Sequence, residues 1–338
     1  MKRSPEVVFV TYHGLPSGDP DDLLALTSLG QMGYATRVCD WLTTAPAALS
    51  GRCVILRSTW DYHHHCQKFL DWITAVGAVA MMRNSENLIT WNCHKSYLLE
   101  LALRGVAIVP TLHISKEEAA LLSEDDLQTR LSAAEKSGAA EWIKGGGVIV
   151  KPAVGLSTFG VKRFAINPSS SASSSSSSSS SSFSSSSSFG PAVEHIRQLA
   201  CGTKASASAV LIQPYLDVVE GYGERSLIFL GGKFSHSVRK SAFQKMAAAG
   251  EAGEMGVQAT AAEITFGEGV LLALGEIFSE SVDAPLYARV DVVPGDDGRP
   301  LLLELELIEP SLFLAMSDGA AQRFATTIDR LLQNGDRS

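Results

Sequence analysis

Two predicted strands near the C-terminus, Tyr287 to Val293 and Leu301 to Leu307, constrain the fold more than any other part of the sequence. In both strands, charged residues alternate with apolar ones. Because alternate residues of a strand share one face, each strand collects its charges on one face and its leucines or valines on the other. The two strands therefore form a hairpin whose apolar face packs into a core. The charged residues are Arg289, Asp291, Glu304 and Glu306.

The charged face of this hairpin admits two interpretations. Several carboxylates that lie between leucine-rich strands are costly to desolvate unless a positive charge neutralises them. Magnesium takes carboxylate and phosphate oxygens together, so Asp291, Glu304 and Glu306 are candidate metal ligands. The alternative is a solvated face, because alternating polar and apolar residues are also typical of a half-exposed sheet.

A second candidate feature is a lysine at the end of a short apolar strand. Lys151 follows Val148-Ile149-Val150 and leads into a loop that contains glycines and hydroxyl residues. Glycines let the backbone approach a phosphate, and successive N–H groups can form an anion cradle. The spacing matches neither the P-loop nor the dinucleotide-binding fingerprint, so an ordinary turn is the alternative.

Composition limits the class of protein. The chain has 338 residues, 45% of them hydrophobic, which suits two or three compact units. The formal net charge of -8 argues against nucleic acid as the main partner, because phosphate backbones reward clustered lysine and arginine. No apolar run reaches the roughly 18–20 residues that span a bilayer, so we expect no membrane partner. The cysteines are scattered without a CxxC pair, which favours a reduced, cytoplasmic location.

Two other patterns carry less weight. The run His63-His64-His65-Cys66 invites a metal assignment, but consecutive residues cannot all face one ion and no second ligand cluster is nearby in sequence. Packing is therefore the better interpretation of this run. The sequence also lacks the Gly-x-Ser-x-Gly elbow, so a serine hydrolase has no support.

The pattern of segments predicts the organisation of the chain. Strand-like and helix-like segments alternate over residues 1–90, which predicts a small α/β unit, and a second unit follows from residue 91. Residues 169–188 are almost entirely serine, and such a tract cannot bury enough apolar surface to offset its ordering entropy. We therefore expect a disordered insertion at 169–189 that carries no chemistry. The Ala- and Gly-rich stretch 246–256 predicts a further loop.

The candidate elements occur in an order that resembles the ATP-grasp superfamily, and the resemblance covers most of the chain. The order is Lys95, the Lys151 loop, a linker at Gln213-Pro214-Tyr215, Arg289-x-Asp291, and Glu304-x-Glu306. The chain is similar in particular to the subgroup that includes the ligase closing the ring in D-cycloserine biosynthesis. The motifs that carry this similarity include Arg57-Ser58-Thr59-Trp60-Asp61-Tyr62, Trp91-Asn92-x-x-Lys95-x-Tyr97-Leu98, Ser235-His236-Ser237-Val238-Arg239-Lys240 and Leu307-Ile308-Glu309-Pro310-Ser311-Leu312.

The resemblance implies a fold and a set of cofactors. The fold is the mixed α/β grasp of glutathione synthetases and D-alanine–D-alanine ligases. A pre-ATP-grasp α/β domain at 1–90 would precede an ATP-grasp domain at 91–335, with a lid subdomain at about 110–215 and a catalytic subdomain at about 216–335. ATP and magnesium are the implied cofactors, with manganese as an alternative metal.

The resemblance also assigns roles residue by residue. Lys95 and Lys151 would contact the ATP phosphates, and the loop carrying Gly155, Ser157 and Gly160 would close over them. Adenine would be held by Gln213, Pro214, Tyr215 and Leu216, and the ribose by Glu224 or, alternatively, Glu220. Asp291, Glu304 and Glu306 would bind magnesium. The implied catalytic residues are Arg289, Lys151 and Arg239, and the candidate substrate contacts are Arg57, Asp61, Tyr62, His236, Arg239 and Lys240.

One position departs from the family pattern. Most members end with Glu-x-Asn, whereas this chain has Glu306 at the second position. A carboxylate there can still bind magnesium and adds a negative charge, so the number of metal ions stays open. Glu309 either shares this role or supports the loop.

The activity that the resemblance implies is an ADP-forming ligase. A substrate carboxylate would be activated as an acyl phosphate, and an amine would then displace phosphate. The partners would be small-molecule carboxylates and amines. The alternatives are a phosphotransferase on the same fold and a nucleotide-binding protein without turnover.

Overall fold

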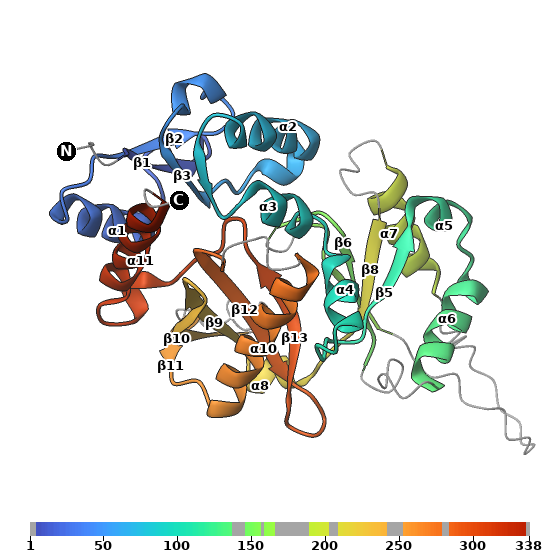
Figure 1. Cartoon of the computed structure of the whole chain (residues 1–338). Helices are drawn as coiled ribbons and strands as arrows, with labels where there is room; N and C mark the ends of the chain where they lie inside the picture. Colours follow the sequence, from blue (N-terminus) through green and yellow to red (C-terminus); the bar gives the residue numbers. More distant parts are fainter. Residues whose placement is uncertain are drawn as a thin grey trace, which may run out of the picture. The chain divides into compact units, whose positions relative to one another are not determined.

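The computed structural model describes residues 5–136, 146–156, 159–165, 189–202, 209–241, 253–278 and 284–335. The chain consists of two compact units, each described here by itself: Met1–Ile108 with Val218–Ser338, and Val109–Asp217. Helices accompany the sheets of both units, which confirms the mixed α/β class (Figure 1). The predicted domain boundaries remain predictions.

The N-terminal part of the first unit is a parallel sheet in the order β2-β1-β3-β4. Its elements are β1 Val7–Thr11, α1 Pro20–Gln31, β2 Thr36–Asp40, η1 Pro46–Leu49, β3 Cys53–Ser58, η2 Tyr62–His64, α2 Cys66–Gly77, β4 Met81–Arg83, α3 Glu86–Asn92 and α4 Tyr97–Leu103. Strands β1 and β3 are buried along their length and mostly apolar, as expected for parallel strands that are covered on both faces. Helix α1 begins at Pro20, because Asp19 caps it and Pro20 fits its first turn.

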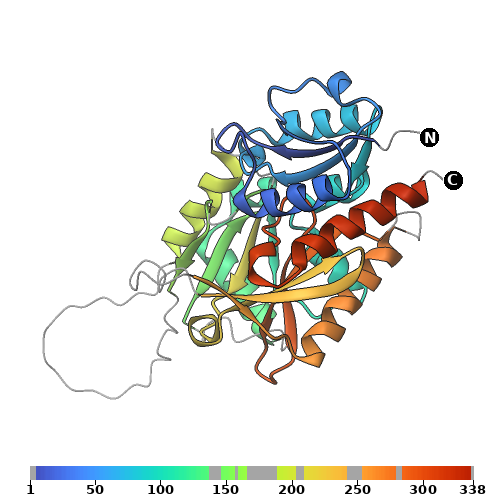
Figure 2. The same cartoon turned by 90° about the vertical axis from the view of Figure 1, so that its left-hand side faces the viewer.

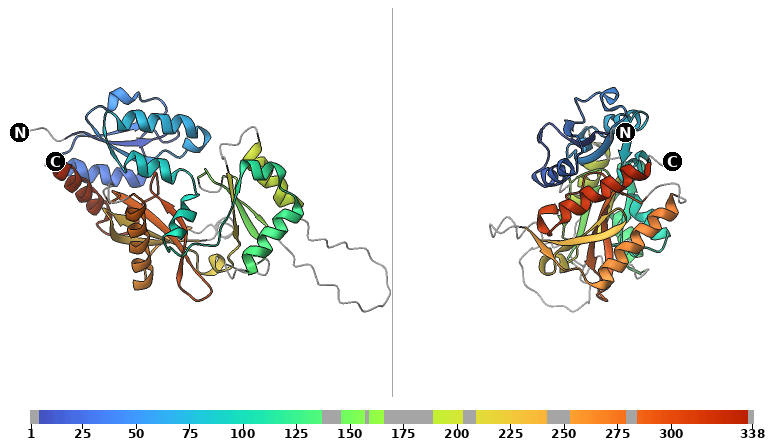
Figure 3. Two further views of the ribbon diagram at one scale, coloured as in Figure 1. Left: turned by 45° about the vertical axis from the view of Figure 1, so that its right-hand side comes forward. Right: turned by 60° about the vertical axis from the view of Figure 1, so that its left-hand side comes forward.

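The C-terminal part of the first unit is an antiparallel sheet in the order β11-β10-β9-β12-β13. Its elements are α8 Val218–Gly221, β9 Glu224–Leu230, β10 Lys233–Lys240, β11 Glu254–Val257, α10 Ala261–Ile277, β12 Tyr287–Pro294, β13 Pro300–Glu306, η3 Leu314–Met316 and α11 Ala320–Gly335. The predicted hairpin β12–β13 is confirmed, and β9 and β10 form a second hairpin. Helix α10 packs along this sheet (Figure 3).

One hydrophobic core joins the two sheets of the first unit. Helix α11 lies beside α1 (Figure 2) and carries Phe324, which is completely buried. The Phe324 ring lies 6.1 Å from the ring of Phe9 in β1 and 6.1 Å from the ring of Tyr287 in β12. The N-terminal sheet is therefore packed against the same core as the charged hairpin, and it can hold the loops around that hairpin in place.

The second unit is an antiparallel sheet in the order β5-β8-β6-β7. Its elements are β5 Leu112–Ser115, α5 Lys116–Leu121, α6 Glu124–Lys136, β6 Val148–Pro152, β7 Lys162–Phe164, α7 Gly190–Cys201 and β8 Ala209–Pro214. Val150 of β6 and Ile212 of β8 pack with the apolar faces of these helices in one core. Phe189 belongs to this core and is buried, so the last residue of the predicted insertion is part of the packed unit.

Some expectations fall on residues outside the described ranges. Residues 169–188 of the predicted insertion lie outside them, as does Ser157. The same holds for most of the predicted loop at 246–256, but its last residues form β11 instead, because Met255 and Gly256 pair with Arg239 and Val238 of β10. Within the described residues, no helix is both long and apolar enough to cross a membrane.

Candidate active site

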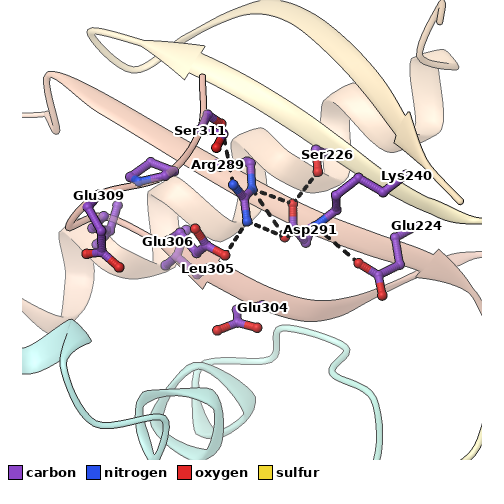
Figure 4. A network of polar contacts seen from close by, with 12 residues as sticks. Glu224, Ser226, Lys240, Arg289, Asp291, Glu304, Leu305, Glu306, Glu309 and Ser311 are labelled. Carbon is purple, nitrogen blue, oxygen red and sulfur yellow. Dashed lines mark hydrogen bonds and ion pairs between the residues drawn. The ribbon is translucent and has the colours of Figure 1, made fainter. Parts of the chain in front are cut away.

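The structure contains the predicted charged face of the β12–β13 hairpin, and its residues contact one another (Figure 4). In the register of the two strands, Asp291 pairs with Glu304 and Arg289 pairs with Glu306. The Arg289 guanidinium donates to both carboxylate oxygens of Asp291, at 3.0 Å from Nε to Oδ1 and 3.1 Å from Nη2 to Oδ2, and it also donates to Glu306. The predicted alternation is thus confirmed, and the solvated-face alternative does not hold for Arg289 and Asp291, which are 7% and 2% exposed.

The neighbouring strands add further charges to this face. Ser226 of β9 lies opposite Asp291 and donates its hydroxyl to Oδ1 at 2.7 Å. Lys240 of β10 donates to Asp291 Oδ2 at 2.8 Å and lies 3.1 Å from a carboxylate oxygen of Glu224. Asp291 is therefore the centre of the cluster, because Arg289, Ser226 and Lys240 all bind it.

The edge of β13 is held by side chains from the α3–α4 segment. Asn92 donates to the Leu305 carbonyl and accepts from the Leu307 N–H, both at 2.8 Å. The Tyr97 hydroxyl accepts the Leu305 N–H at 3.1 Å, and Lys95 donates to Glu304. These contacts explain the motif Trp91-Asn92-x-x-Lys95-x-Tyr97. Its side chains complete the hydrogen bonding of an edge strand that carries the candidate metal ligands.

Burial and charge set the protonation of the cluster. Burial acts to raise the pKa of Asp291, but Arg289 and Lys240 outweigh it and hold that pKa below its usual range. Burial raises the pKa of Glu306, against the opposing effect of Arg289. It raises the pKa of Glu309 well above its usual range, and the charge of Glu306 adds to this. Asp291 is therefore the firmly ionised carboxylate of the set.

The donor set fits magnesium in chemistry and in charge. Carboxylate oxygens are the ligands that magnesium takes in proteins. The cluster holds five carboxyl groups and three cationic side chains, so a divalent ion would balance the two excess negative charges that are present when all five carboxyls are ionised. The groups are Glu224, Asp291, Glu304, Glu306 and Glu309, against Lys95, Lys240 and Arg289. No three acidic, histidine or cysteine side chains within the described ranges are already arranged around a metal position. Glu304 and Glu306 contact Lys95 and Arg289 instead, so metal binding requires these carboxylates to exchange contacts.

The loop that follows β13 is fixed by hydrogen bonds from four side chains. Each carbonyl from Glu309 to Leu312 accepts from a different one of them. The pairs are Trp60 with Glu309, Arg57 with Pro310, Arg289 with Ser311 and His236 with Leu312, at 3.2, 3.1, 3.4 and 2.8 Å. Phe313 follows at φ 52°, a left-handed conformation that is costly for a residue with a Cβ atom. We refer to residues 309–313 as the clamped loop.

The candidate substrate contacts separate into two groups. Arg57 is 2% exposed, pairs with Asp22 at 2.7 Å and lies over the Tyr287 ring, so most of its guanidinium is committed to the core. Tyr62 is stacked on Phe69, and His236 binds the clamped loop. By contrast, Lys240 reaches the charged cluster. Asp61 accepts the Trp41 indole N–H at 2.7 Å.

Arg239 and Lys240 are adjacent in β10 and serve different sites, because successive strand residues point to opposite faces. Lys240 joins the cluster around Asp291, whereas Arg239 donates to the carbonyls of Tyr222 and Gly221, both at 2.7 Å. The structure does not bring Arg239 together with Arg289, and its catalytic role remains a prediction.

The second unit carries the remaining nucleotide candidates. Lys151 lies in β6 and is 7% exposed, and Gln213 lies in β8 and donates to Thr111 at 2.9 Å. The Tyr215 N–H donates to the Gly147 carbonyl at 2.9 Å, and the Arg163 guanidinium lies 3.3 Å above the Tyr215 ring. Gly160 adopts φ +68°, which favours glycine. The other candidates here are Gly155, Pro214 and Leu216, all within described ranges of this unit.

The two candidate ribose ligands lie in the first unit. Glu224 begins β9 and contacts Lys240, whereas Glu220 lies on α8 and is exposed. Sequence reasoning missed Ser226 and Asn84, and it gave Trp60 no role beyond its place in a motif. Asn84 is buried, accepts the Leu286 N–H and donates to the carbonyls of Tyr287 and Leu307. Ser226 and Asn84 each follow an arginine in the sequence, so no apolar pattern marks them.

Comparisons with known proteins agree with this geometry. A family model described as the N-terminal domain of D-cycloserine synthetase DcsG matches residues 7–84. The cycloserine biosynthesis protein DcsG of Streptomyces lavendulae is 29% identical over 306 residues, which cover 89% of this chain and 90% of that protein. The crystal structure of D-cycloserine synthetase DcsG matches with a TM-score of 0.78 and 26% identity, covering 96% of this chain and 99% of that one.

A more distant structure shows the fold alone. The ATP-grasp ligase PsnB, solved with a minimal precursor, Mg and ADP, has a TM-score of 0.54 at 15% identity and covers 98% of this chain and 99% of its own. Together these findings give the chain the fold of the ATP-grasp ligases. It is similar to D-cycloserine synthetase along nearly all of its length.

Proposed function

We propose that this chain is an ATP- and magnesium-dependent ligase that joins a carboxylate to an amine and releases ADP and phosphate. The observation that carries the proposal is the buried cluster of carboxylates and cations on the β12–β13 face. It lies in a chain that resembles D-cycloserine synthetase over 89% of its length. An ordinary sheet surface has no need of a buried Arg289–Asp291–Lys240 arrangement, because buried ion pairs add little net stability.

The reaction needs two displacements. A carboxylate oxygen of the substrate attacks the γ-phosphorus of ATP, the bond from that phosphorus to the β–γ bridging oxygen breaks, and ADP leaves. The amine nitrogen then attacks the acyl carbon, the bond to the phosphate oxygen breaks, and the nitrogen loses a proton. Arg289, held by Asp291, would stabilise the negative charge that develops on the acyl phosphate and the tetrahedral intermediate.

The remaining candidates keep their proposed roles. Asp291, Glu304 and Glu306 would hold magnesium, or manganese in its place, and the ion would neutralise phosphate charge when bound. Lys95 and Lys151 would bind phosphates, and Gly155, Ser157 and Gly160 would close over them. Gln213, Pro214, Tyr215 and Leu216 would hold adenine, Glu224 or Glu220 the ribose, and Arg239 would contact the substrate.

The test is product analysis with candidate acids and amines, together with thermal shifts produced by D-cycloserine, the compound after which the similar synthetase is named. Release of both ADP and phosphate, dependent on a carboxylate, supports the ligase. ADP without phosphate, with a phosphorylated product, would show a phosphotransferase. Tight nucleotide binding with no turnover across the panel would show a binding protein.

The departure at Glu306 yields a separate prediction. Glu306→Asn restores the usual family residue and removes a carboxyl whose pKa burial already raises, so we expect kcat to stay within about tenfold of the parent. The magnesium concentration for half-maximal activity should rise several-fold, because one negative charge is lost. Glu304→Gln is the comparison, with an expected loss of about 100-fold in kcat. Equal losses in both variants would contradict distinct roles for the two positions.

A further inference from the structure

Glu309 has a carboxylate oxygen that nothing in the described part of the chain satisfies. Its side chain is buried at 4% exposure, and Oε2 is inaccessible to solvent and has no hydrogen-bond partner there. A buried acceptor without a donor costs about 1–3 kcal/mol, and more when it is charged. The cation that would pair with it is therefore not among the described side chains.

The nearby cations are already engaged. Lys95 donates to Glu304, and Arg289 donates to Asp291 and Glu306, so neither binds Glu309. Figure 4 shows Glu309 at one end of the network with no contact drawn to it. A water molecule would satisfy the acceptor but would supply no cation to a cluster that holds five carboxyl groups and three cationic side chains.

The backbone of Glu309 is held more firmly than a surface loop. Its carbonyl accepts from Trp60, and the next three carbonyls accept from Arg57, Arg289 and His236. The left-handed Phe313 closes the same loop. Such fixed placement is typical of a group that must meet a ligand in one geometry.

Two cationic ligands would suit the free oxygen, a metal ion and an ammonium group. Magnesium requires several oxygen ligands in near-octahedral geometry. The proposed magnesium ligands Asp291, Glu304 and Glu306 contact Lys95, Lys240 and Arg289, and none of these contacts includes Glu309. An ammonium needs only hydrogen-bond acceptors, and a single buried carboxylate binds it as a charge-assisted pair.

We propose that Glu309 binds the ammonium group of an amino-acid-type substrate and thereby selects amine-bearing substrates over their hydroxyl counterparts. This inference rests on the proposed ligase function, whose activated carboxylate and amine would belong to such molecules. Glu309 would act as a binding residue. It lies three residues after Glu306, so an ammonium group bound to it would lie near the cluster that activates the carboxylate.

The experiment compares matched ligand pairs by thermal shift in the presence of magnesium and a non-hydrolysable ATP analogue. The pairs are D- and L-alanine with D- and L-lactate, and D- and L-serine with D- and L-glycerate. In the parent chain, at least one amino acid should bind at least tenfold more tightly than its hydroxyl partner. In Glu309→Gln that preference should vanish, and Glu309→Asp should restore part of it. A preference that survives in Glu309→Gln, or a parent chain that prefers no amine, would overturn the proposal.

Glu263→Gln is the matched control. Glu263 is likewise a buried carboxylate, 5% exposed, but it accepts from Thr260 and Tyr222 at the start of α10. We expect this variant to melt at a lower temperature with amine preference intact. We expect Glu309→Gln to melt no lower than the parent, because it removes a buried carboxyl group whose Oε2 has no partner in the described residues. A lower melting temperature for Glu309→Gln, with amine preference unchanged, would show a purely structural residue.

Measurements of turnover separate this inference from the proposed function. Amine preference that depends on Glu309, without ADP formation, would support the ammonium site and reject the ligase. Carboxylate-dependent release of ADP and phosphate, with the KM for the amino acid unchanged in Glu309→Gln, would reject the ammonium site alone.

Discussion

Asparagine in place of Asp291 is expected to lower the rate of ADP formation by about 100-fold or more, the scale on which one charged group of a preorganised site acts. Asp291 binds Arg289, Lys240 and Ser226 at once, so the change removes the charge that holds both cations. The free energy of unfolding should also fall, by about 3 kcal/mol, because the buried Arg289 loses its bidentate partner and keeps only Glu306, and Lys240 keeps only Glu224. Steady-state kinetics and urea denaturation measure the two effects.

The same hairpin provides the control. Asp297 lies in the exposed turn between β12 and β13, where it pairs with Arg299. Asp297→Asn should therefore leave both activity and stability within experimental error of the parent. Asp291 has a lowered pKa, so its contribution to stability is present above the ordinary value of 3.8 and is lost as the pH falls further. The stability gap between Asp291→Asn and the parent should accordingly close in strong acid, and a gap independent of pH would contradict the ion-pair explanation.

Much of the fold could be predicted because local patterns agree with tertiary packing. The alternation in β12 and β13 placed Arg289 and Asp291 on one face, where the structure has them. Strand β11 was not predicted, because Met255-Gly256 does not show the alternation of apolar and polar residues that is typical of a strand. The position of β11 depends on non-local hydrogen bonds to β10, and a local sequence pattern does not reveal such bonds.

The candidate site divides in the same way. The sequence identified which residue types would gather, but it did not separate Arg239 from Lys240, since the register of β10 decides which side chain faces Asp291. It also grouped Arg57 with substrate contacts, although the burial of Arg57 against Asp22 follows from the packing of two sheets that are distant in sequence. The electrostatic roles of these residues were therefore decided by tertiary contacts, which a single sequence does not contain.

The Arg57–Asp22 pair leads to the second large expected effect. Arg57→Met leaves Asp22, which is 1% exposed, without its partner, and it removes the donor to the Pro310 carbonyl. Burial already acts to raise the pKa of Asp22, so the unpaired carboxylate would be strongly destabilising. We expect the free energy of unfolding to fall by about 3–5 kcal/mol, measured by urea denaturation.

A double-mutant cycle tests the cause. Replacing both partners, as in Asp22→Leu with Arg57→Met, should recover most of the lost stability, because two apolar groups can take the place of a buried ion pair at little net cost. Activity should not recover to the same extent, since Pro310 would still lack its donor and the clamped loop would be held by three side chains instead of four. If stability recovers but activity does not, Arg57 supports the site by holding the clamped loop. If both recover fully, Arg57 contributes only to the packing of the core.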